Sequence, residues 1–202
     1  LKKYSRYKDS SVPWVGEIPE HWELKKIKFI ANVFNGNSLN EISKKNFESY
    51  DENHIPYISS KDINVNNSVI NYRNGLRIPA ENNQLKIAPS YSSLLCIEGG
   101  SAGRKVAFTN QKVFFVNKLA CFFNTQQNNS KYLHFSLRGS LFQNQFKINL
   151  SGMIGGVSIS TINNFKILIP PLQEQTAIAK FLDDKTQKID EAIAIKQQQI
   201  AL

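Results

Sequence analysis

The sequence predicts an α/β (α+β mixed) protein, in which a globular domain with a mixed, largely antiparallel β-sheet and flanking helices precedes a long C-terminal coiled-coil-type helix. Three observations predict this class. Between about residues 57 and 123, short apolar runs alternate with Asn, Gly, Pro and Ser, which is typical of strands joined by loops. Leucines and phenylalanines then recur at helical spacing over residues 131–146. Finally, Pro170-Pro171 separates an apolar run from a terminal amphipathic segment, and two adjacent prolines fit inside neither element.

The apolar runs give the positions of the individual elements. Residues 24–33 fit either a strand or a short helix, because their periodicity does not decide. A single helix is expected over 131–146, a glycine-rich loop over 151–157, and a turn or one helical turn over 160–165. The candidate strands are 56–59, 93–97, 106–108, 112–116, 119–123 and 166–169.

The first 23 residues differ from the rest because they carry both tryptophans, Trp14 and Trp22, among prolines and a glycine. Aromatic rings in a proline-bounded segment favour an extended stretch that wraps the domain. We expect this segment to dock its rings on the body.

The last 32 residues form one amphipathic helix over 171–202, behind a globular domain over 1–170. Such a narrow apolar seam favours pairing with a partner helix; the alternative is a helix that packs only on its own domain. We expect the first two turns to contact the domain and the far end to project. On a heptad the two core positions are Ala179, Thr186, Ile193 and Ile200, and Leu182, Ile189 and Lys196.

The net charge of +9 is unevenly distributed. From Gly99 through Gln173 the chain has eight Lys or Arg and no Asp or Glu. A long stretch without acids gives a positive field that attracts a polyphosphate, whereas a surface built only for solubility mixes both signs. The charge therefore favours nucleic acid as the partner.

Composition also bears on the compartment. No apolar run approaches the ~20 residues that cross a bilayer, and no apolar segment follows the charges of residues 1–9, so neither a membrane anchor nor a secretory signal is expected. Cys96 and Cys121 each lie inside an apolar run, which favours buried reduced thiols over a disulfide. We expect a cytoplasmic protein.

Motifs for catalysis are weak, and no catalytic residue or metal site is expected. The chain has three histidines, and none lies at metal-ligand spacing from another histidine, a cysteine or a pair of acids. They are His21, His54 and His134. The Gly99–Lys105 turn lacks the spacing of a phosphate-binding loop. Glu23-Leu24-Lys25 has the E-x-K spacing of metal-dependent nucleases but no acid on a preceding core strand. A small metal-dependent nuclease with an unrecognised site remains an alternative.

Four stretches together resemble the DNA-specificity subunits of Type I restriction–modification systems. The first and last are the most specific, because few unrelated domains join a proline-bounded strand to Pro-Pro-Leu-x-Glu-Gln-x-x-Ile-Ala. The resemblance spans essentially the whole chain and covers one target-recognition domain and one spacer helix. The stretches are residues 4–8 with 14–22, residues 55–63, residues 99–104, and residues 156–160 through 169–175.

The resemblance implies a non-catalytic subunit. In that family the recognition domain reads a short half-site in double-stranded DNA, and the long helix pairs antiparallel with a second one. Methylation subunits that use S-adenosylmethionine and a restriction/translocase subunit that uses ATP and Mg²⁺ join it, so no cofactor is expected in this chain. The usual subunit has two recognition domains and two helices. This chain would be a fragment of such a subunit or a half-subunit that dimerises; a stand-alone DNA-binding or scaffold protein is the other alternative.

Candidate DNA-contacting residues fall into two chemical groups. Lysines and arginines suit phosphate contacts, and amide, hydroxyl and aromatic side chains suit base edges or stacking. The phosphate candidates are Lys44, Lys45, Lys61, Arg73, Arg77, Arg104, Lys105 and Lys118. The base-edge candidates are Asn64, Asn66, Asn67, Tyr72, Ser101 and Asn117.

Overall fold

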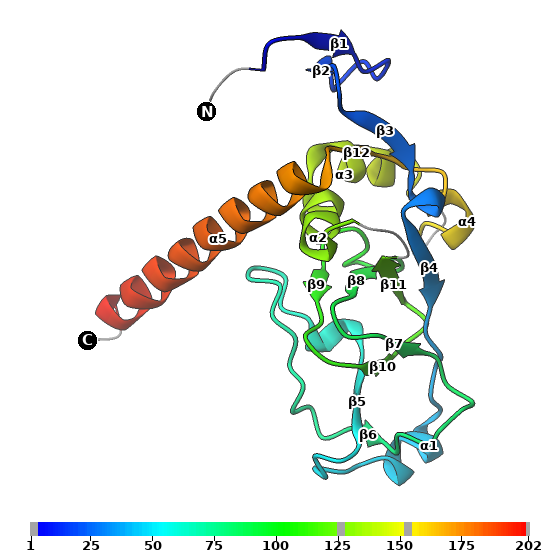
Figure 1. Ribbon diagram of the computed structural model, residues 1–202. Coiled ribbons are helices and arrows are strands. Elements are labelled where there is room, and N and C mark those ends of the chain that lie inside the picture. The colour runs from blue at the N-terminus through cyan, green and yellow to red at the C-terminus, as the bar shows by residue number, and fades with distance from the viewer. Residues whose placement is uncertain (1–3, 125–127, 152–154, 201–202) are drawn as a thin grey trace.

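The computed structural model describes residues 4–124, 128–151 and 155–200. It consists of an elongated body and one long helix, α5 (Leu172–Ile200), that leaves one end of the body and projects away from it (Figure 1). The glycine-rich loop expected over 151–157 lies outside the described residues at 152–154. No helix in the described part of the chain is long and apolar enough to cross a membrane.

Two short two-stranded sheets form the end of the body from which α5 leaves. Strand β1 (Tyr7–Asp9) pairs with β2 (Glu17–Pro19), and β3 (Glu23–Lys26) pairs with β12 (Lys166–Ile169), both antiparallel. The pairing of β3 with β12 brings the start of the chain beside the strand that leads into α5 (Figure 1). Trp22 is half-buried there, but Trp14 is 49% exposed. The expectation that both rings dock is therefore wrong for Trp14, because its turn is closed by local hydrogen bonds such as Ser10 N–H to the Gly16 carbonyl, at 3.0 Å.

Two four-stranded sheets form the rest of the body. One has the order β4-β11-β8-β9 and is antiparallel throughout: β4 is Ala31–Asn35, β11 Leu119–Asn124, β8 Ser93–Cys96 and β9 Val106–Phe108. The other has the order β6-β5-β10-β7, where β5 is Ile55–Ile58, β6 Arg77–Ile78, β7 Ile87–Ala88 and β10 Val113–Phe115. Only the β5–β10 pair among these is parallel. The predicted mixed, largely antiparallel class is confirmed, although the strands are divided among several sheets.

The core explains why the strands lack strict alternation of apolar and polar residues. In β8 all four residues are buried. Leu95 packs into a cluster shared with the helices, whereas Leu94 and Cys96 pack into a cluster shared with the second sheet. A strand covered on both faces is apolar on both, so it forms a continuous run.

Two helices cover the outer face of the first sheet, where the sequence suggested one. Helix α2 (Ser130–Arg138) ends and α3 (Ser140–Ile148) begins at Gly139, whose backbone is extended (φ −70°, ψ 154°). The single helix expected over 131–146 is therefore wrong. Both helices point their apolar faces inward, with Leu137 and Phe142 fully buried. The helical spacing of apolar residues therefore continues from α2 into α3 despite the break.

The ambiguous segment 24–33 contains both kinds of element. Strand β3 ends in a 3-10 turn over Ile27–Phe29, and β4 begins two residues later. The one helical turn expected over 160–165 is α4 (Ile159–Ile162), and the last strand, 166–169, is confirmed as β12. At the opposite end of the body from α5 lies the short helix α1 (Glu41–Asn46) (Figure 1).

Candidate nucleic-acid interface

A cleft of about 400 Å³ opens beside α1, lined by lysines and uncharged polar residues together with apolar side chains such as Leu39, Leu76 and Val116. Four of the residues that the sequence nominated for DNA contact line it together, although they come from three distant segments: Lys44, Lys61, Asn117 and Lys118. Lys44 lies on α1, Lys61 on the 3-10 turn Ser60–Asp62, and the other two on the β10–β11 connection. We call this the basic cleft.

The parallel pairing of β5 with β10 creates the cleft. Tyr57 lies opposite Phe114 and Ile58 opposite Phe115, and the Val116 N–H donates to the Ile58 carbonyl at 2.9 Å. Parallel strands end at the same edge of a sheet. The residues that follow each strand therefore meet there, which brings Lys61 beside Lys118.

The cleft lysines meet few carboxylates. Lys44 forms an ion pair with Glu41 at 2.6 Å, and Lys118 lies 3.7 Å from Glu98. The hydrogen bond from Lys44 holds the pKa of the Glu41 carboxyl below its usual range, and the charge of Lys61 contributes in the same direction. These partners are exposed, and exposed ion pairs are weak enough for phosphates to replace.

The one buried acid at the cleft is held by the fold. Asp62 is buried, and its carboxylate accepts hydrogen bonds from the Ser59 N–H at 2.8 Å and the Ser59 hydroxyl at 2.6 Å. This capping box fixes the turn that carries Lys61. Lys105 supports the same wall, because its ammonium donates to the Ser60 carbonyl at 2.6 Å.

Some nominated residues hold loops instead of lining the cleft. Arg77 donates to the carbonyls of Asp51 at 3.1 Å and His54 at 2.6 Å, so its guanidinium closes the turn before β5. The Tyr72 hydroxyl accepts the Asn110 N–H at 3.3 Å, and burial raises its pKa.

The asparagines of the 64–69 loop build turns. The Asn64 side-chain oxygen accepts the Asn66 N–H at 2.9 Å, and that of Asn67 accepts the Val69 N–H at 3.2 Å. Asparagine favours such local bonds, which explains much of its abundance in this chain. Asn67 and Tyr72 line a second cavity, between the body and α5.

The remaining nominated residues, apart from Lys45 on α1, lie in connections between elements. Ser101 and Arg104 belong to the β8–β9 turn, where Gly99 and Gly103 adopt positive φ. Arg104 is exposed there, as are Lys45 at the end of α1 and Arg73 before β6. Whether any of these residues contacts DNA stays a prediction.

Several cleft residues escaped the sequence reasoning. Ser38, Asn74 and Tyr57 line the cleft as well. The Ser38 hydroxyl donates to the Asn117 side-chain oxygen at 2.7 Å, and the Asn74 amide donates to the Tyr57 carbonyl at 2.8 Å. Nothing in their local sequence marks them, because the sheet pairing alone brings these segments together.

The described residues contain no group of three or more His, Cys, Asp or Glu that could hold a metal ion. The E-x-K residues Glu23 and Lys25 form an ion pair with each other on β3. Among the histidines, His21 pairs with Glu174, and His134 is a buried residue of α2 that lines the cavity between α2 and α5.

The residues proposed for helix pairing divide into two groups along α5. Ala179 is 3% exposed, Leu182 and Thr186 are half-buried, and all three face the body. Ile189, Ile193, Lys196 and Ile200 are exposed. The expectation that the base contacts the domain and the far end projects agrees with this arrangement (Figure 1).

Two polar residues of the Pro-Pro-Leu-Gln-Glu-Gln segment fix the base of α5. Glu174 accepts hydrogen bonds from the Tyr4 hydroxyl at 2.8 Å and the Trp22 indole N–H at 2.9 Å, and pairs with His21 Nε2 at 2.6 Å. Burial alone would raise the pKa of Glu174, but these hydrogen bonds outweigh it and lower the pKa. Gln175, only 1% exposed, makes its own set of bonds to the body.

Three solved structures share this fold. One, from a study of complex assembly and conformational transition in the type I R-M system, matches with a TM-score of 0.66 at 16% identity, over 90% of this chain and 42% of that one. The HsdS subunit from Thermoanaerobacter tengcongensis matches with a TM-score of 0.61 at 17% identity, over 90% of this chain and 41% of that one. The S subunit from M. genitalium matches with a TM-score of 0.61 at 16% identity, over 98% of this chain and 45% of that one. The chain thus spans less than half the length of each.

The Type I restriction modification DNA specificity domain family matches residues 19–201. The chain belongs to that family.

Proposed function

We propose that this chain is one recognition half of a Type I restriction–modification specificity subunit, and that its basic cleft holds a half-site of double-stranded DNA. The observation that carries the proposal is the convergence of Lys44, Lys61 and Lys118 on one cleft from three separate segments. Cationic side chains around a cleft attract the phosphate backbone, and polar side chains between them can contact base edges.

The cleft chemistry suggests a division of labour. The three lysines face the phosphates, and release of counterions from the DNA gives the affinity. Ser38 and Asn117 carry the hydroxyl and amide groups that can read base edges, whereas the Asn74 amide holds the Tyr57 carbonyl and the Leu76 N–H. Sequence preference would then depend on Ser38 and Asn117 more than on the lysines.

The projecting part of α5 supports a second role. Ile189, Ile193 and Ile200 are exposed on it, and apolar residues at this spacing stabilise helix pairs. We propose that residues 171–202 pair with an equivalent helix, while residues 1–170 recognise DNA. The second helix would come from the other half of a longer subunit or from a second copy of this chain.

The family suggests the remaining partners. Methylation subunits would supply S-adenosylmethionine chemistry, and a restriction/translocase subunit would supply ATP- and Mg²⁺-dependent translocation and cleavage, so this chain itself would be non-catalytic. The buried free thiols Cys96 and Cys121 suit the reducing cytoplasm.

DNA binding tests the proposal directly. Affinity for a labelled duplex is measured by fluorescence anisotropy over a range of salt for the wild-type chain, Lys61→Ala, Lys118→Ala and the control Lys188→Ala, which changes an exposed residue of α5. Each cleft variant should bind more weakly and lower the slope of log K against log salt by about 0.9, whereas the control should match the wild type. Equal effects of all three substitutions would contradict the cleft assignment. Metal-dependent cleavage of the duplex by the purified chain would favour the nuclease alternative.

A further inference from the structure

The direction of α5 relative to the body is set by contacts near its base. On one side, Glu174 binds Tyr4, His21 and Trp22 of the N-terminal segment. These bonds hold the first turn of the helix. They leave the direction of the later turns to contacts further along.

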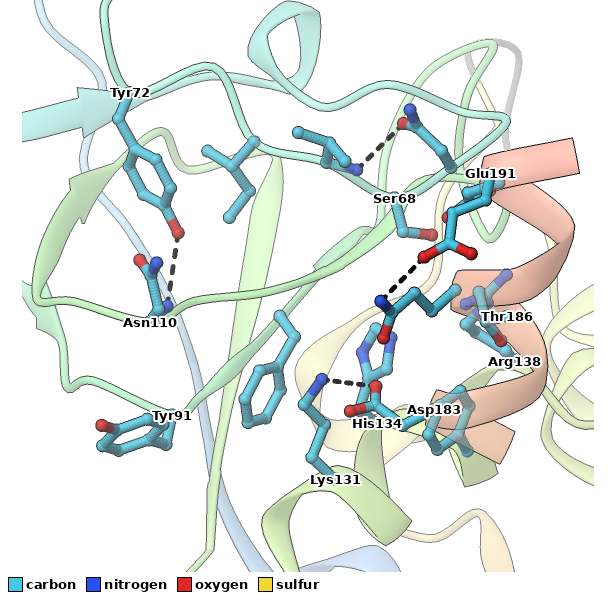
Figure 2. A pocket seen from close by; sticks show the side chains of 17 residues that line it. Ser68, Tyr72, Tyr91, Asn110, Lys131, His134, Arg138, Asp183, Thr186 and Glu191 are labelled. Atoms are coloured by element: carbon cyan, nitrogen blue, oxygen red, sulfur yellow. Dashed lines mark hydrogen bonds and ion pairs between the residues drawn. The ribbon is translucent and has the colours of Figure 1, made fainter. Parts of the chain in front are cut away.

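The last polar contact between α5 and the body is made by Lys131, at the start of α2. Its ammonium lies 2.7 Å from a carboxylate oxygen of Asp183, the twelfth residue of α5 (Figure 2), and 4.9 Å from the centre of the Phe108 ring on β9. One side chain thus links α5, α2 and the sheet. Among the described residues, no hydrogen bond or ion pair joins α5 to the body beyond Asp183.

A cavity of about 560 Å³ lies between α5 and the body; Lys131 and Asp183 line it, and it extends along the helix to Glu191. Thr186, Asp190 and Glu191 line it from α5, and the Asn67–Tyr72 loop lines it from the opposite side (Figure 2). The cavity gives the helix room to change its angle. Acidic and basic side chains both line this cavity, because Asp183, Asp190 and Glu191 of α5 share it with Lys131 and Arg138 of α2.

We propose that Lys131 and Asp183 are a positioning pair, which sets the angle of α5 and through it the number of base pairs between two half-sites. This inference rests on the proposed function, in which paired helices hold two recognition bodies on one DNA. About 25 Å of helix follows Asp183, at 1.5 Å per residue. A rotation of about 10° there moves the far end by about 4 Å, more than the 3.4 Å between adjacent base pairs.

A positioning pair affects the angle of α5, whereas a stabilising pair affects the free energy of unfolding. An exposed ion pair contributes little to stability, so Lys131→Ala should leave the urea midpoint of unfolding close to that of the wild type. The angle of α5 should change nevertheless, because the pair links the fourth turn of α5 directly to α2. Lys180→Ala is the matched control: it removes the exposed Lys180–Asp184 ion pair, which lies within α5 and contacts nothing on the body.

Distances between spin labels test the angle in the chain alone. Nitroxides on Gln111→Cys, between β9 and β10, and Gln198→Cys, near the end of α5, occupy exposed positions, while Cys96 and Cys121 are buried. Pulsed electron resonance should give one narrow distance distribution for the wild type and Lys180→Ala, and a shifted or broader one for Lys131→Ala. The swap Lys131→Asp with Asp183→Lys should restore the narrow distribution. An unchanged distribution in Lys131→Ala would overturn the positioning role.

DNA then tests the consequence. Binding is measured on duplexes in which the spacing between two half-sites, found by selection from a random pool, changes one base pair at a time. The wild type should prefer one spacing. Lys131→Ala should bind several spacings equally well, while its affinity for a single half-site stays close to that of the wild type. The same sharp preference in both proteins would overturn the spacing claim. If the wild-type chain bound no DNA, the proposed function would fail together with the spacing claim, whereas the label distances would still report on the positioning pair.

Discussion

The side-chain amide of Gln175 donates a hydrogen bond to the Pro170 carbonyl, 2.8 Å away across the double proline. The same amide donates to the Asn128 side-chain oxygen at 2.9 Å, and its oxygen accepts the Asn129 N–H at 3.0 Å. Prolines at 170 and 171 end the last strand, and this buried amide closes the turn that follows. Gln175 therefore fixes where α5 leaves the body.

Loss of that amide should destabilise the body. Gln175→Ala removes the partner of three buried or half-buried polar groups, which typically costs about 1–3 kcal/mol in the free energy of unfolding. Urea denaturation measures the change. Gln173→Ala, on an exposed neighbour in the same turn, should stay within about 0.5 kcal/mol of the wild type. Equal midpoints for the two variants would show that the Gln175 bonds do not hold the base of the helix.

The close approach of Gly36 to β10 gives a second prediction. A Cβ at this position would lie 1.8 Å from the Phe115 carbonyl oxygen, which is backbone and cannot rotate away. Gly36→Ala should therefore destabilise the protein by about 3 kcal/mol or more, or prevent folding, because it forces β4 and β10 apart. Gly100→Ala is the control, since a Cβ there meets nothing within 4 Å. Folded, equally stable Gly36→Ala protein would contradict the packing of these strands.

Stability should depend on pH through His134. Burial, together with the charges of Arg138 and Lys131, lowers the pKa of His134 to about 3. Its ring lies between those of Phe108 and Phe135, with centroids 5.6 Å and 5.5 Å away, where a proton is poorly solvated. Between pH 6.5 and 3 the unfolded chain thus binds the proton more tightly than the folded chain, so His134 lowers stability progressively as the pH falls through this range.

Comparison with His134→Gln isolates this effect. Above pH 6.5 the difference in free energy of unfolding between the two proteins should be constant. Below it, the wild type should lose stability relative to the variant by up to about 1.4 kcal/mol per pH unit. Urea denaturation at several pH values measures both curves. Parallel curves over the whole range would mean that His134 stays solvated.

The two cysteines should be unreactive in the folded protein. Burial raises the pKa of Cys121 to about 12 and also raises that of Cys96. The thiolate is the reacting form, so at pH 8 a thiol-reactive dye should label the native chain far more slowly than the chain in urea, where both residues should react. Rapid labelling of one thiol in native protein would show that the sheets open locally at that residue.

Much of the fold follows from local sequence. The continuous apolar runs at 93–97 and 119–123 predict strands, and they are continuous because both faces of these strands are buried. Pro170-Pro171 correctly predicts where the terminal helix starts. The apolar spacing gives no sign of the helix break at Gly139, because it continues unchanged from α2 into α3. Helical periodicity records which side faces the core, and that side is the same in α2 and α3.

The candidate site was only partly predictable. Positive charge nominated Lys44, Lys61 and Lys118, but the parallel β5–β10 pairing that brings them together depends on segments far apart in the chain. The same pairing brings Ser38 and Asn74 into the cleft without any local signal. Arg77 shows the opposite case: its charge suggested a phosphate contact, whereas its guanidinium holds two backbone carbonyls.

Selection of DNA sequences by the cleft is the most direct test of the central claim. The chain is incubated with a pool of random duplexes, and the bound fraction is sequenced for the wild type and for a Ser38→Ala, Asn117→Ala variant that keeps the cleft lysines. The wild type should enrich one short motif, and the variant should bind with similar salt dependence but relax the motif at one or more positions. No enrichment by the wild type, or the same motif in both proteins, would contradict sequence recognition by this cleft.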